Sequence, residues 1–413
     1  MTTRSLFWTL LLAGMGLRIL WALLVPVVPI SDGWAYHQFA RTLAEHGTYG
    51  WTPDEPTAYW AVGTSALVAL TYLVHDGFAG VVVLNLLAGL AILLLTHRLA
   101  LRWFGEAAAL WALALVAFWP NLVFFTTIVS SELFFIAAML AGLFFWRRPA
   151  GPPLVNLALA GLLWGLTAYI RPVVLLVPAA LALVELPGGP RRFAAASLRA
   201  AAAIALISLV VLPWSLRNEG VFGERVTVST NFGANLWMGN NPDSTGGYMP
   251  LPPEVEGMGE VERSRYLQTL AWDYMSENPL DALGLMGRKL VRLYGRETIG
   301  VVWNEEGLRP LVGEGGVLLL KLAATGYWYL LVLGALAGVA VLARRAGPVA
   351  ALFNPPVALW GYFTLLHVII VADDRYHMPT STFVATMAAV ALASLGARWS
   401  GHPAERMRAG GTT

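Results

Sequence analysis

Long apolar runs are the feature that most limits what this chain can fold into. A helix needs about 20 apolar residues to cross a hydrocarbon core of about 30 Å, and ten runs approach or reach this length. They cover residues 6–28, 78–97, 107–126, 131–146, 154–170, 172–186, 197–214, 316–342, 349–371 and 379–395. The sequence therefore predicts an all-α polytopic membrane protein with about ten transmembrane helices.

The composition agrees with a membrane protein and excludes other classes. Of the 413 residues, 57% are hydrophobic and only 13% are charged, whereas a soluble globular chain carries roughly 25% charged residues. This excludes a cytosolic enzyme of ordinary composition and a disordered tail protein. The net charge is only +2 with scattered basic residues, so no basic face is available to nucleic acid. The lack of cysteine removes disulfides, thiol nucleophiles and Cys-ligated metals.

The arginines between the runs predict the orientation. They fall on one face if the apolar stretch 58–74 is a helix in an outer loop rather than an eleventh span. These arginines are Arg4, Arg98, Arg102, Arg147, Arg148, Arg191, Arg192, Arg199, Arg344, Arg345, Arg398, Arg406 and Arg408. The positive-inside rule makes that face cytoplasmic. We therefore expect both termini inside the cell, the first run to be a retained anchor, and residues 29–77, 215–315 and 372–378 outside.

This orientation divides the chain into four parts. We expect a transmembrane module over residues 1–214 that includes the outer loop 29–77, and an external cap over 215–315. C-terminal transmembrane helices follow over 316–396, and a cytoplasmic tail covers 397–413. The cap holds 14 of the 25 acidic residues and no spanning run.

The cap is expected to be a small α/β or mainly helical unit. Its sequence predicts a short strand over residues 226–230, a Gly/Asn/Pro-rich loop over 231–248 and two juxtamembrane helices separated at Asn278-Pro279. The second helix has leucines on one side and cations on the other, a pattern that suits a membrane surface. The cations are Arg288, Lys289, Arg292 and Arg296.

Polar residues gather at the expected outer ends of the spans, where a membrane chain retains them against a desolvation cost. Ser31 and Asp32 follow the first span. Either residue would serve as a helix N-cap, and Asp32 would also serve as a general base at the membrane surface; these two roles are compatible. Glu132 lies at the outer end of the third and fourth spans, where it would cap a helix or act in a site.

Two further groups share this face. Glu55 and Tyr59 belong to an acidic and aromatic segment that suits either an interfacial aromatic belt or a binding site. Arg171, Arg217 and Arg375 are isolated external arginines. Arg375 would pair with a neighbouring aspartate at the surface, with little effect on stability, or the three arginines would converge to bind a phosphate through bidentate hydrogen bonds. The sequence contains no H-E-x-x-H, G-x-S-x-G or Walker motif.

These motifs resemble those of the GT-C superfamily of polyprenyl-phosphate-sugar-dependent glycosyltransferases, especially the family of protein O-mannosyltransferases and lipid A aminoarabinose transferase. The family's proline and aromatic segment is similar to residues 56–63, although its usual Pro-Gly-Tyr-Pro is replaced by Val62-Gly63-Thr64-Ser65. The other similar segments are Asp32-x-x-x-Tyr36 through Gly47-x-Tyr49, Ser131-Glu132, Arg171-Pro172, Pro213-Trp214-x-x-Arg217-Asn218, Ser229-Thr230 through Asn240-Asn241-Pro242, and Arg375-Tyr376-x-x-Pro379.

The resemblance implies an inverting glycosyltransferase at the outer face of the cell (inner) membrane, which moves a sugar from a polyprenyl-phosphate donor to an acceptor hydroxyl. It implies that Asp32 is the general base, that Glu132 is the second acidic catalytic residue, and that Arg171, Arg217 and Arg375 stabilise the leaving phosphate. The remaining candidates for substrate contacts are Glu55, Tyr59, Asn218, Asn240, Asn241 and Tyr376.

The sequence leaves open the acceptor, the need for a metal and two alternative functions. The acceptor would be a glycan, a lipid or a protein, and a divalent cation, Mg or Mn, would fit between Asp32 and Glu132. A transporter or flippase of lipid-linked sugars would share the composition, but it is expected to carry ionisable groups or broken helices at mid-membrane. A non-catalytic scaffold that binds a partner through the cap is the third alternative.

Overall fold

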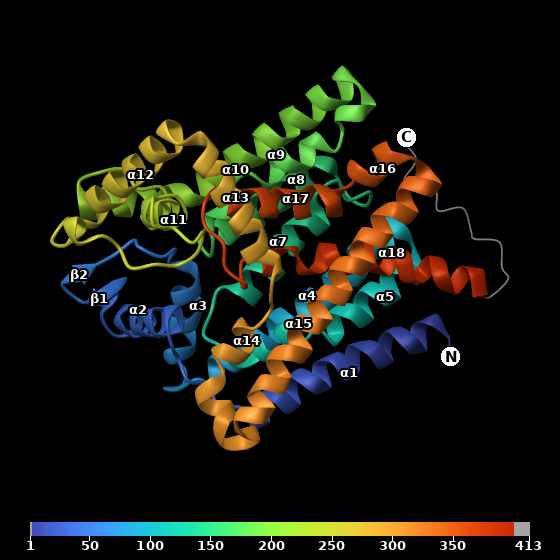
Figure 1. The fold of residues 1–413 in the computed structure, drawn as a ribbon, viewed down its shortest axis with the longest axis horizontal. Coiled ribbons are helices and arrows are strands. Elements are labelled where there is room, and N and C mark those ends of the chain that lie inside the picture. Colours follow the sequence, from blue (N-terminus) through green and yellow to red (C-terminus); the bar gives the residue numbers. More distant parts are fainter. Residues whose placement is uncertain (1, 400–413) are drawn as a thin grey trace.

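The computed structural model of the protein describes residues 2–399 and is almost entirely helical (Figure 1). Residues 400–413 of the expected tail, with Arg406 and Arg408, lie outside the described residues, as does the side chain of Arg398. The N-terminal elements are α1 (Thr3–Leu24), α2 (Asp32–His46), β1 (Gly50–Thr52), β2 (Glu55–Pro56) and α3 (Gly63–Tyr72). The two strands form an antiparallel hairpin in the first outer loop.

The middle of the chain forms a series of helices that lie against one another. They are α4 (Ala79–Phe104), α5 (Glu106–Ala117), α6 (Pro120–Phe124), α7 (Glu132–Phe145), α8 (Pro153–Ala168), α9 (Val177–Leu183) and α10 (Pro190–Phe222). The segment after α10 folds as α11 (Phe232–Gly239), α12 (Glu260–Glu277), α13 (Pro279–Tyr294) and α14 (Ile299–Val302). The last helices are α15 (Glu305–Ala346), α16 (Pro348–Leu352), α17 (Pro355–Ile369) and α18 (Ser381–Trp399).

Five helices of the described chain are long and apolar enough to cross a membrane, or six if the bent pair α5 and α6 counts as one span. They are α1, α4, α10, α15 and the segment Met378–Gly396. Other predicted spans form shorter apolar helices; α7 has 14 residues and α8 has 16. The prediction of a multi-pass helical membrane protein agrees with these helices, while the count of ten spans remains a prediction.

The stretch 58–74 contains α3, which has 10 residues. At 1.5 Å per residue it is about 15 Å long, too short to cross a bilayer. The predicted strand over residues 226–230 is wrong. That segment is irregular, and its backbone meets the outer loop through one hydrogen bond, from Thr230 N to Ala58 O. Helix α10 continues past residue 214 and α15 begins before residue 316, so both cross the expected boundaries of the cap. The division into domains remains a prediction.

A buried arginine stabilises the break between α5 and α6. The two helices meet at a bend of 58°, which leaves the last carbonyls of α5 without partners in the helix. Arg18 of α1 donates to two of them, Val116 O at 3.1 Å and Ala117 O at 2.9 Å. The side chain of Arg18 is almost wholly buried, so this charge inside the apolar helix α1 has a structural role.

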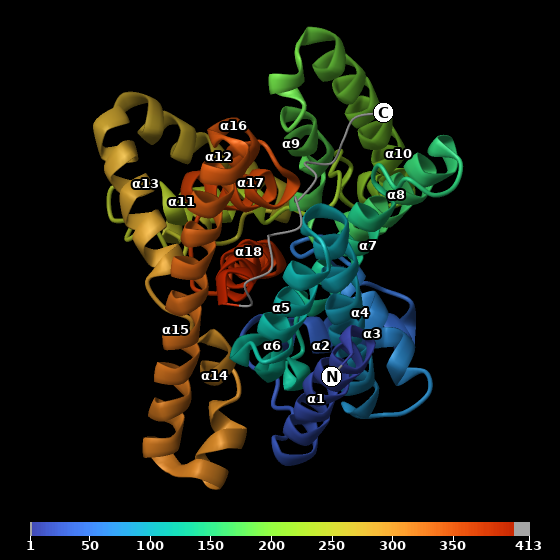
Figure 2. The ribbon, with the colours of Figure 1, turned by 90° about the vertical axis from the view of Figure 1, so that its right-hand side faces the viewer.

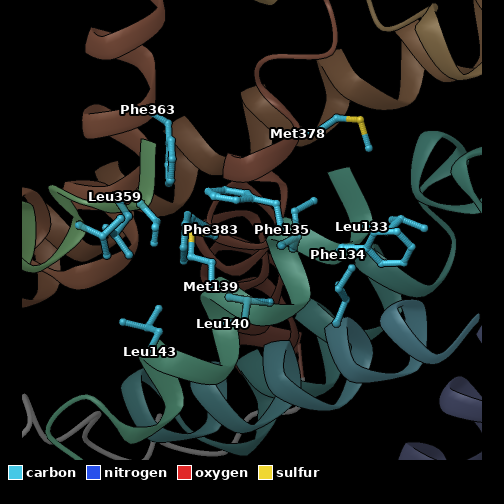
Figure 3. Packing of buried hydrophobic residues seen from close by; sticks show 14 of the residues in the cluster. Leu133, Phe134, Phe135, Met139, Leu140, Leu143, Leu359, Phe363, Met378 and Phe383 are labelled. Atoms are coloured by element: carbon cyan, nitrogen blue, oxygen red, sulfur yellow. The ribbon is translucent and has the colours of Figure 1, made fainter. Parts of the chain in front are cut away.

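The core surrounds the last helix. Figure 2 shows α18 lying between α15 and α5, and both helices contact it. Figure 3 shows Phe135 and Met139 of α7 beside Phe363 of α17 and Phe383 of α18, within the largest apolar cluster. Because α7, α17 and α18 pack together, the loops at their ends are brought to one region of the molecule.

The contact between α15 and α18 depends on Gly338. A Cβ at this position would lie 1.8 Å from Met387 O of α18, so any larger residue must push the helices apart. We expect Gly338→Ala to destabilise the protein by about 1–3 kcal/mol, measured as a lower midpoint of thermal unfolding in detergent. Gly326→Ala on the same helix is the matched control, because a Cβ there meets nothing within 4 Å. Equal effects of the two substitutions would contradict this account of the packing.

Candidate active site

Asp32 opens α2 just after the first apolar helix. Pro26 and Pro29 separate it from α1, and Ser31 adopts φ 51° and ψ −130°, a conformation that costs energy in a non-glycine residue. The Ser31 side chain makes no capping hydrogen bond, so the capping role considered for it is not seen. Gly33 allows α2 to approach the segment before α7, since a Cβ there would lie 2.8 Å from Val129 O.

Arg375 joins this helix to the C-terminal part of the chain. Its Nη1 lies 2.7 Å from Asp32 Oδ2 and 3.9 Å from Glu132 Oε1. The guanidinium lies 4.7 Å from the centre of the Trp303 ring. Burial lowers the pKa of Arg375, but the charges of Asp32 and Glu132 outweigh burial and raise it well above its ordinary value. The surface pair of Arg375 with a neighbouring aspartate is therefore not formed.

Glu132 is the first residue of α7, and its side chain is only 1% exposed. It forms an ion pair with Arg171, which follows α8. Arg171 Nε also donates to Ser131 Oγ at 2.7 Å. The second carboxylate oxygen of Glu132 is buried, and no hydrogen bond to it is found within residues 2–399. Two acids and two arginines from four separate segments thus form one cluster, which we call the charged cluster: Asp32, Glu132, Arg171 and Arg375.

Tyrosines line this cluster. Tyr36, one helical turn after Asp32, is buried, and burial followed by the Asp32 charge raises its pKa. It was not among the predicted site residues, although its i, i+4 spacing from Asp32 places both on one face of a helix. Tyr59 and Tyr376 belong to one apolar cluster. Burial raises the pKa of Tyr59 to about 12, and the charge of Asp32 also acts on it.

Arg217 is not brought together with the two arginines of the charged cluster. It donates to Thr57 O at 3.0 Å and to Tyr49 O at 3.3 Å, so it holds the first outer loop. Asn218 accepts from Arg217 and donates to Val226 O at 3.2 Å. Both side chains are thus used in the fold, and these contacts give neither a place beside the cluster.

The remaining predicted contacts also lie elsewhere. Asn240 and Asn241 are buried, and their side chains bond backbone groups: Asn240 donates to Ile369 O and Ile370 O, and Asn241 donates to Trp237 O. Glu55 is exposed on β2. The acid that binds the first outer loop is instead Glu260 of α12, which accepts from Thr57 Oγ1, Ala58 N and Thr230 Oγ1 at 2.6–2.9 Å.

His377 and Glu297, which were not among the predicted site residues, form a buried pair that fixes the loop carrying Arg375. His377 Nδ1 donates to Leu293 O at 2.8 Å, and His377 Nε2 lies 3.2 Å from Glu297 Oε1. Trp119 Nε1 donates to both oxygens of Glu297 at 2.8 and 3.0 Å, and burial raises the pKa of Glu297. The neighbouring Asp374 accepts from Thr298 N and Thr298 Oγ1. The residues on both sides of Arg375 therefore have fixed positions.

The charged cluster does not fit a divalent cation between Asp32 and Glu132. Within the described residues, no group of three or more His, Cys, Asp or Glu side chains could hold a metal ion. One nitrogen of Arg375 faces both carboxylates, and Arg171 pairs with Glu132. A cation between the acids would have to displace Arg375 and would face the charge of Arg171. We therefore assign no step to a metal.

The structure of this protein is similar in fold to solved structures of known proteins. No protein-family model and no curated protein matches the sequence. Structures of the oligosaccharyltransferase AglB from Archaeoglobus fulgidus do match. One, in complex with an inhibitory peptide and a dolichol-phosphate, has a TM-score of 0.56 at 14% identity. Another, tethered to an acceptor peptide with the NVT sequon, has a TM-score of 0.58 at 14% identity.

A third such structure, in complex with Zn and sulfate, has a TM-score of 0.55 at 15% identity. Each match covers 96% of this chain and 50% of the other, so the chain spans about half of the length of these structures. The protein therefore shares the fold of these oligosaccharyltransferase structures. The GT-C resemblance is confirmed at the level of the fold, and the closer likeness to O-mannosyltransferases remains a prediction.

Lys289, a buried lysine that donates to Asn240, is expected to make the stability of the protein depend on pH. Lys289 Nζ donates to Asn240 Oδ1 and Ile369 O, both at 2.8 Å, and burial lowers its pKa from 10.5 to about 8. Between these two values the unfolded chain binds more protons than the folded chain, so stability rises with pH. We expect the thermal midpoint to increase between pH 8 and 9.5 more in the wild type than in Lys289→Met.

The control uses Lys321, the other lysine of the sequence. Lys321 forms an ion pair with Glu305, so Lys321→Met should lower stability without removing the rise with pH. If Lys289→Met retains the full rise, Lys289 is not the group that titrates.

Proposed function

We propose that this protein is a membrane glycosyltransferase that moves a sugar from a polyprenyl-phosphate donor to an acceptor hydroxyl. The observation that carries the proposal is the ion pair of Asp32 with Arg375 beside that of Glu132 with Arg171. A general base and two groups that bind phosphate thus meet at the end of an apolar helix. The AglB structures with dolichol-phosphate and with an acceptor peptide support a lipid-phosphate donor and an acceptor for this fold.

Asp32 is the proposed base because it is the carboxylate that solvent can reach. Its side chain is 21% exposed, while that of Glu132 is nearly inaccessible. Asp32 accepts the proton of the acceptor hydroxyl as the hydroxyl oxygen attacks the anomeric carbon. The bond from this carbon to the phosphate oxygen breaks on the opposite face, and the configuration inverts. The electron pair of the broken bond leaves with the lipid phosphate.

The arginines are the proposed partners of the leaving phosphate. Negative charge grows on the phosphate as the bond breaks, and donors that are already in position stabilise this charge most effectively. Arg375 pairs with Asp32 in the structure. In the proposed reaction its guanidinium turns to the phosphate, which frees Asp32 to accept a proton. Glu132 is the positioning residue for both arginines, since one of its oxygens faces Arg171 and Arg375.

The proposed location follows from the same geometry. We place the cluster at the outer face of the cell membrane with both termini in the cytoplasm, as the arginine distribution predicts. A donor with a long isoprenoid chain is insoluble in water, so its phosphate has to be met at a membrane surface. The structure places Asp32 directly after the apolar helix α1, which is where such a phosphate would lie.

The first test is sugar transfer by the purified protein. Asp32→Asn retains a hydrogen-bond acceptor for Arg375 but lacks a base, so we expect transfer by the folded variant to fall by a factor of about 10² or more, with a lower thermal midpoint because Arg375 loses a charged partner. Asp54→Asn, an exposed change in the same outer loop, should leave transfer intact. Near-normal transfer by the Asp32 variant would remove this residue from the proposed role.

The second test separates the arginines by their contacts. Arg375→Gln removes a charge-assisted interaction worth about 1.5–3 kcal/mol, so the dissociation constant for polyprenyl phosphate should rise about 10- to 100-fold. Arg217→Gln should instead lower the thermal midpoint and leave the affinity unchanged, because Arg217 holds the backbone of the outer loop. The opposite pattern of effects would assign the phosphate to Arg217.

A further inference from the structure

Helix α13 lies at the edge of the molecule (Figure 2) with much of its apolar surface uncovered. Leu280, Leu283 and Val291 are 81%, 62% and 71% exposed. The opposite side, which includes Leu285 and Leu293, is buried against the protein. A soluble protein would not present such leucines to water, and a chain with five apolar helices of spanning length has a bilayer that can cover them.

Three arginines occupy the flank between these two sides of α13 and its C-terminal end. Arg288 and Arg292 lie one turn apart on α13, and Arg296 lies two residues beyond its last residue, Tyr294; we call these three residues the arginine row. They line a cavity of about 610 Å³ whose other lining residues are Thr245, Gly287, Val291 and Gly295. No carboxylate lines this cavity. The cavity therefore offers three positive charges to a ligand.

The aspartates near this row compensate its positive charge only weakly. Asp373 Oδ1 lies 3.9 Å from Arg292 Nε, and Asp374 Oδ2 lies 3.5 Å from Arg296 Nε. Asp374 Oδ2 also accepts from Thr298 N and Thr298 Oγ1, and Arg292 Nε is buried without a hydrogen-bond acceptor in the part of the chain that the structure describes. The positive charge of the row is thus only partly compensated.

The backbone of the preceding loop fixes the middle arginine. A Cβ at Gly247 would lie 2.2 Å from Arg292 Nε, so the loop packs directly against the guanidinium because it has no side chain there. Arg292 is consequently less free than a surface arginine and loses less entropy when it binds an anion.

An apolar groove lies on another side of the same helix. Leu290 and Tyr294 of α13 and Val357, Trp360 and Leu365 of α17 line a second cavity of about 430 Å³. A hydrocarbon chain fits this lining, whereas a soluble anion would gain nothing from it. Phosphate-binding charges and a groove for a hydrocarbon chain on one helix indicate a lipid.

We propose that α13 lies in the membrane surface and binds anionic phospholipids, with their phosphates at Arg288, Arg292 and Arg296 and an acyl chain along the groove between α13 and α17. The row extends from Arg288 on α13 to Arg296 beyond the end of that helix, so more than one phosphate can lie along it. Within the described residues, these arginines have no ion pair with Asp32 or Glu132, unlike Arg171 and Arg375. Arg292 and Arg296 face Asp373 and Asp374, which precede Arg375 in the chain, so the test below compares binding of phospholipid with binding of polyprenyl phosphate.

The test measures binding of phosphatidylglycerol to the purified full chain by native mass spectrometry and by quenching of tryptophan with a labelled lipid. R288Q/R292Q/R296Q should weaken this binding about tenfold or more, and the binding should fall with added salt. R288K/R292K/R296K, which keeps the charges, should retain most of it. R225Q/R265Q/R309Q removes three arginines elsewhere in residues 215–315 and should bind as the wild type does.

Three further probes identify the ligand. Phosphatidylcholine and inorganic phosphate should not displace phosphatidylglycerol at equal concentration, and a short-chain phosphatidylglycerol should bind more weakly than a long-chain one. R288Q/R292Q/R296Q should keep its affinity for polyprenyl phosphate, which separates this proposal from the proposed transferase function. Thermal unfolding checks that each variant is folded.

The proposal is overturned if the glutamine variant is folded and binds phosphatidylglycerol normally, or if R225Q/R265Q/R309Q loses binding to the same extent. Loss of polyprenyl phosphate binding alone would assign the row to the donor, and full competition by inorganic phosphate would assign it to a soluble anion. Should the glutamine variant fail to fold, loss of phosphatidylglycerol binding by the folded lysine variant would also reject the charge-based site.

Discussion

The bond between Asp32 and Arg375 is the interaction on which the rest of the site depends. Removing two charges from water is costly unless they meet each other with good geometry, and the protein meets this condition with residues from opposite parts of its sequence. The packing of α7, α17 and α18 brings their ends together, and the His377–Glu297 pair fixes the loop on which Arg375 lies. The apolar core and the polar site therefore depend on each other.

The acids and arginines of this site were predictable because of where they occur in the sequence. A charged residue at the end of an apolar run carries a desolvation cost, and Asp32, Glu132, Arg171 and Arg375 all stood out for that reason. Their pairing was not predictable, since it depends on helix packing between distant segments. Asn240 was a candidate because of the family resemblance, and its side chain donates to backbone carbonyls instead. Sequence alone does not tell whether an amide bonds a substrate or the protein.

The fold was predictable to a similar degree. Apolar runs identified the helical regions, but lengths of helices depend on where the backbone breaks. Residues 107–126 form one apolar run, yet Pro120 begins a new helix there and Arg18 binds the carbonyls that the break exposes. Conversely, α10 continues through Pro213. A strand was expected over residues 226–230 from its β-branched residues, and no neighbouring strand exists to pair with it in the described chain.

The central position of α18 has a consequence for how the protein is made. Among the described helices it is made last, yet it packs against α5, which is made much earlier. Until α18 is made, the surface of α5 that packs against it lacks this partner. The described helices can therefore complete their packing only after α18 has been made, and the charges of Asp32 and Glu132 stay partly unmatched until Arg375 reaches them.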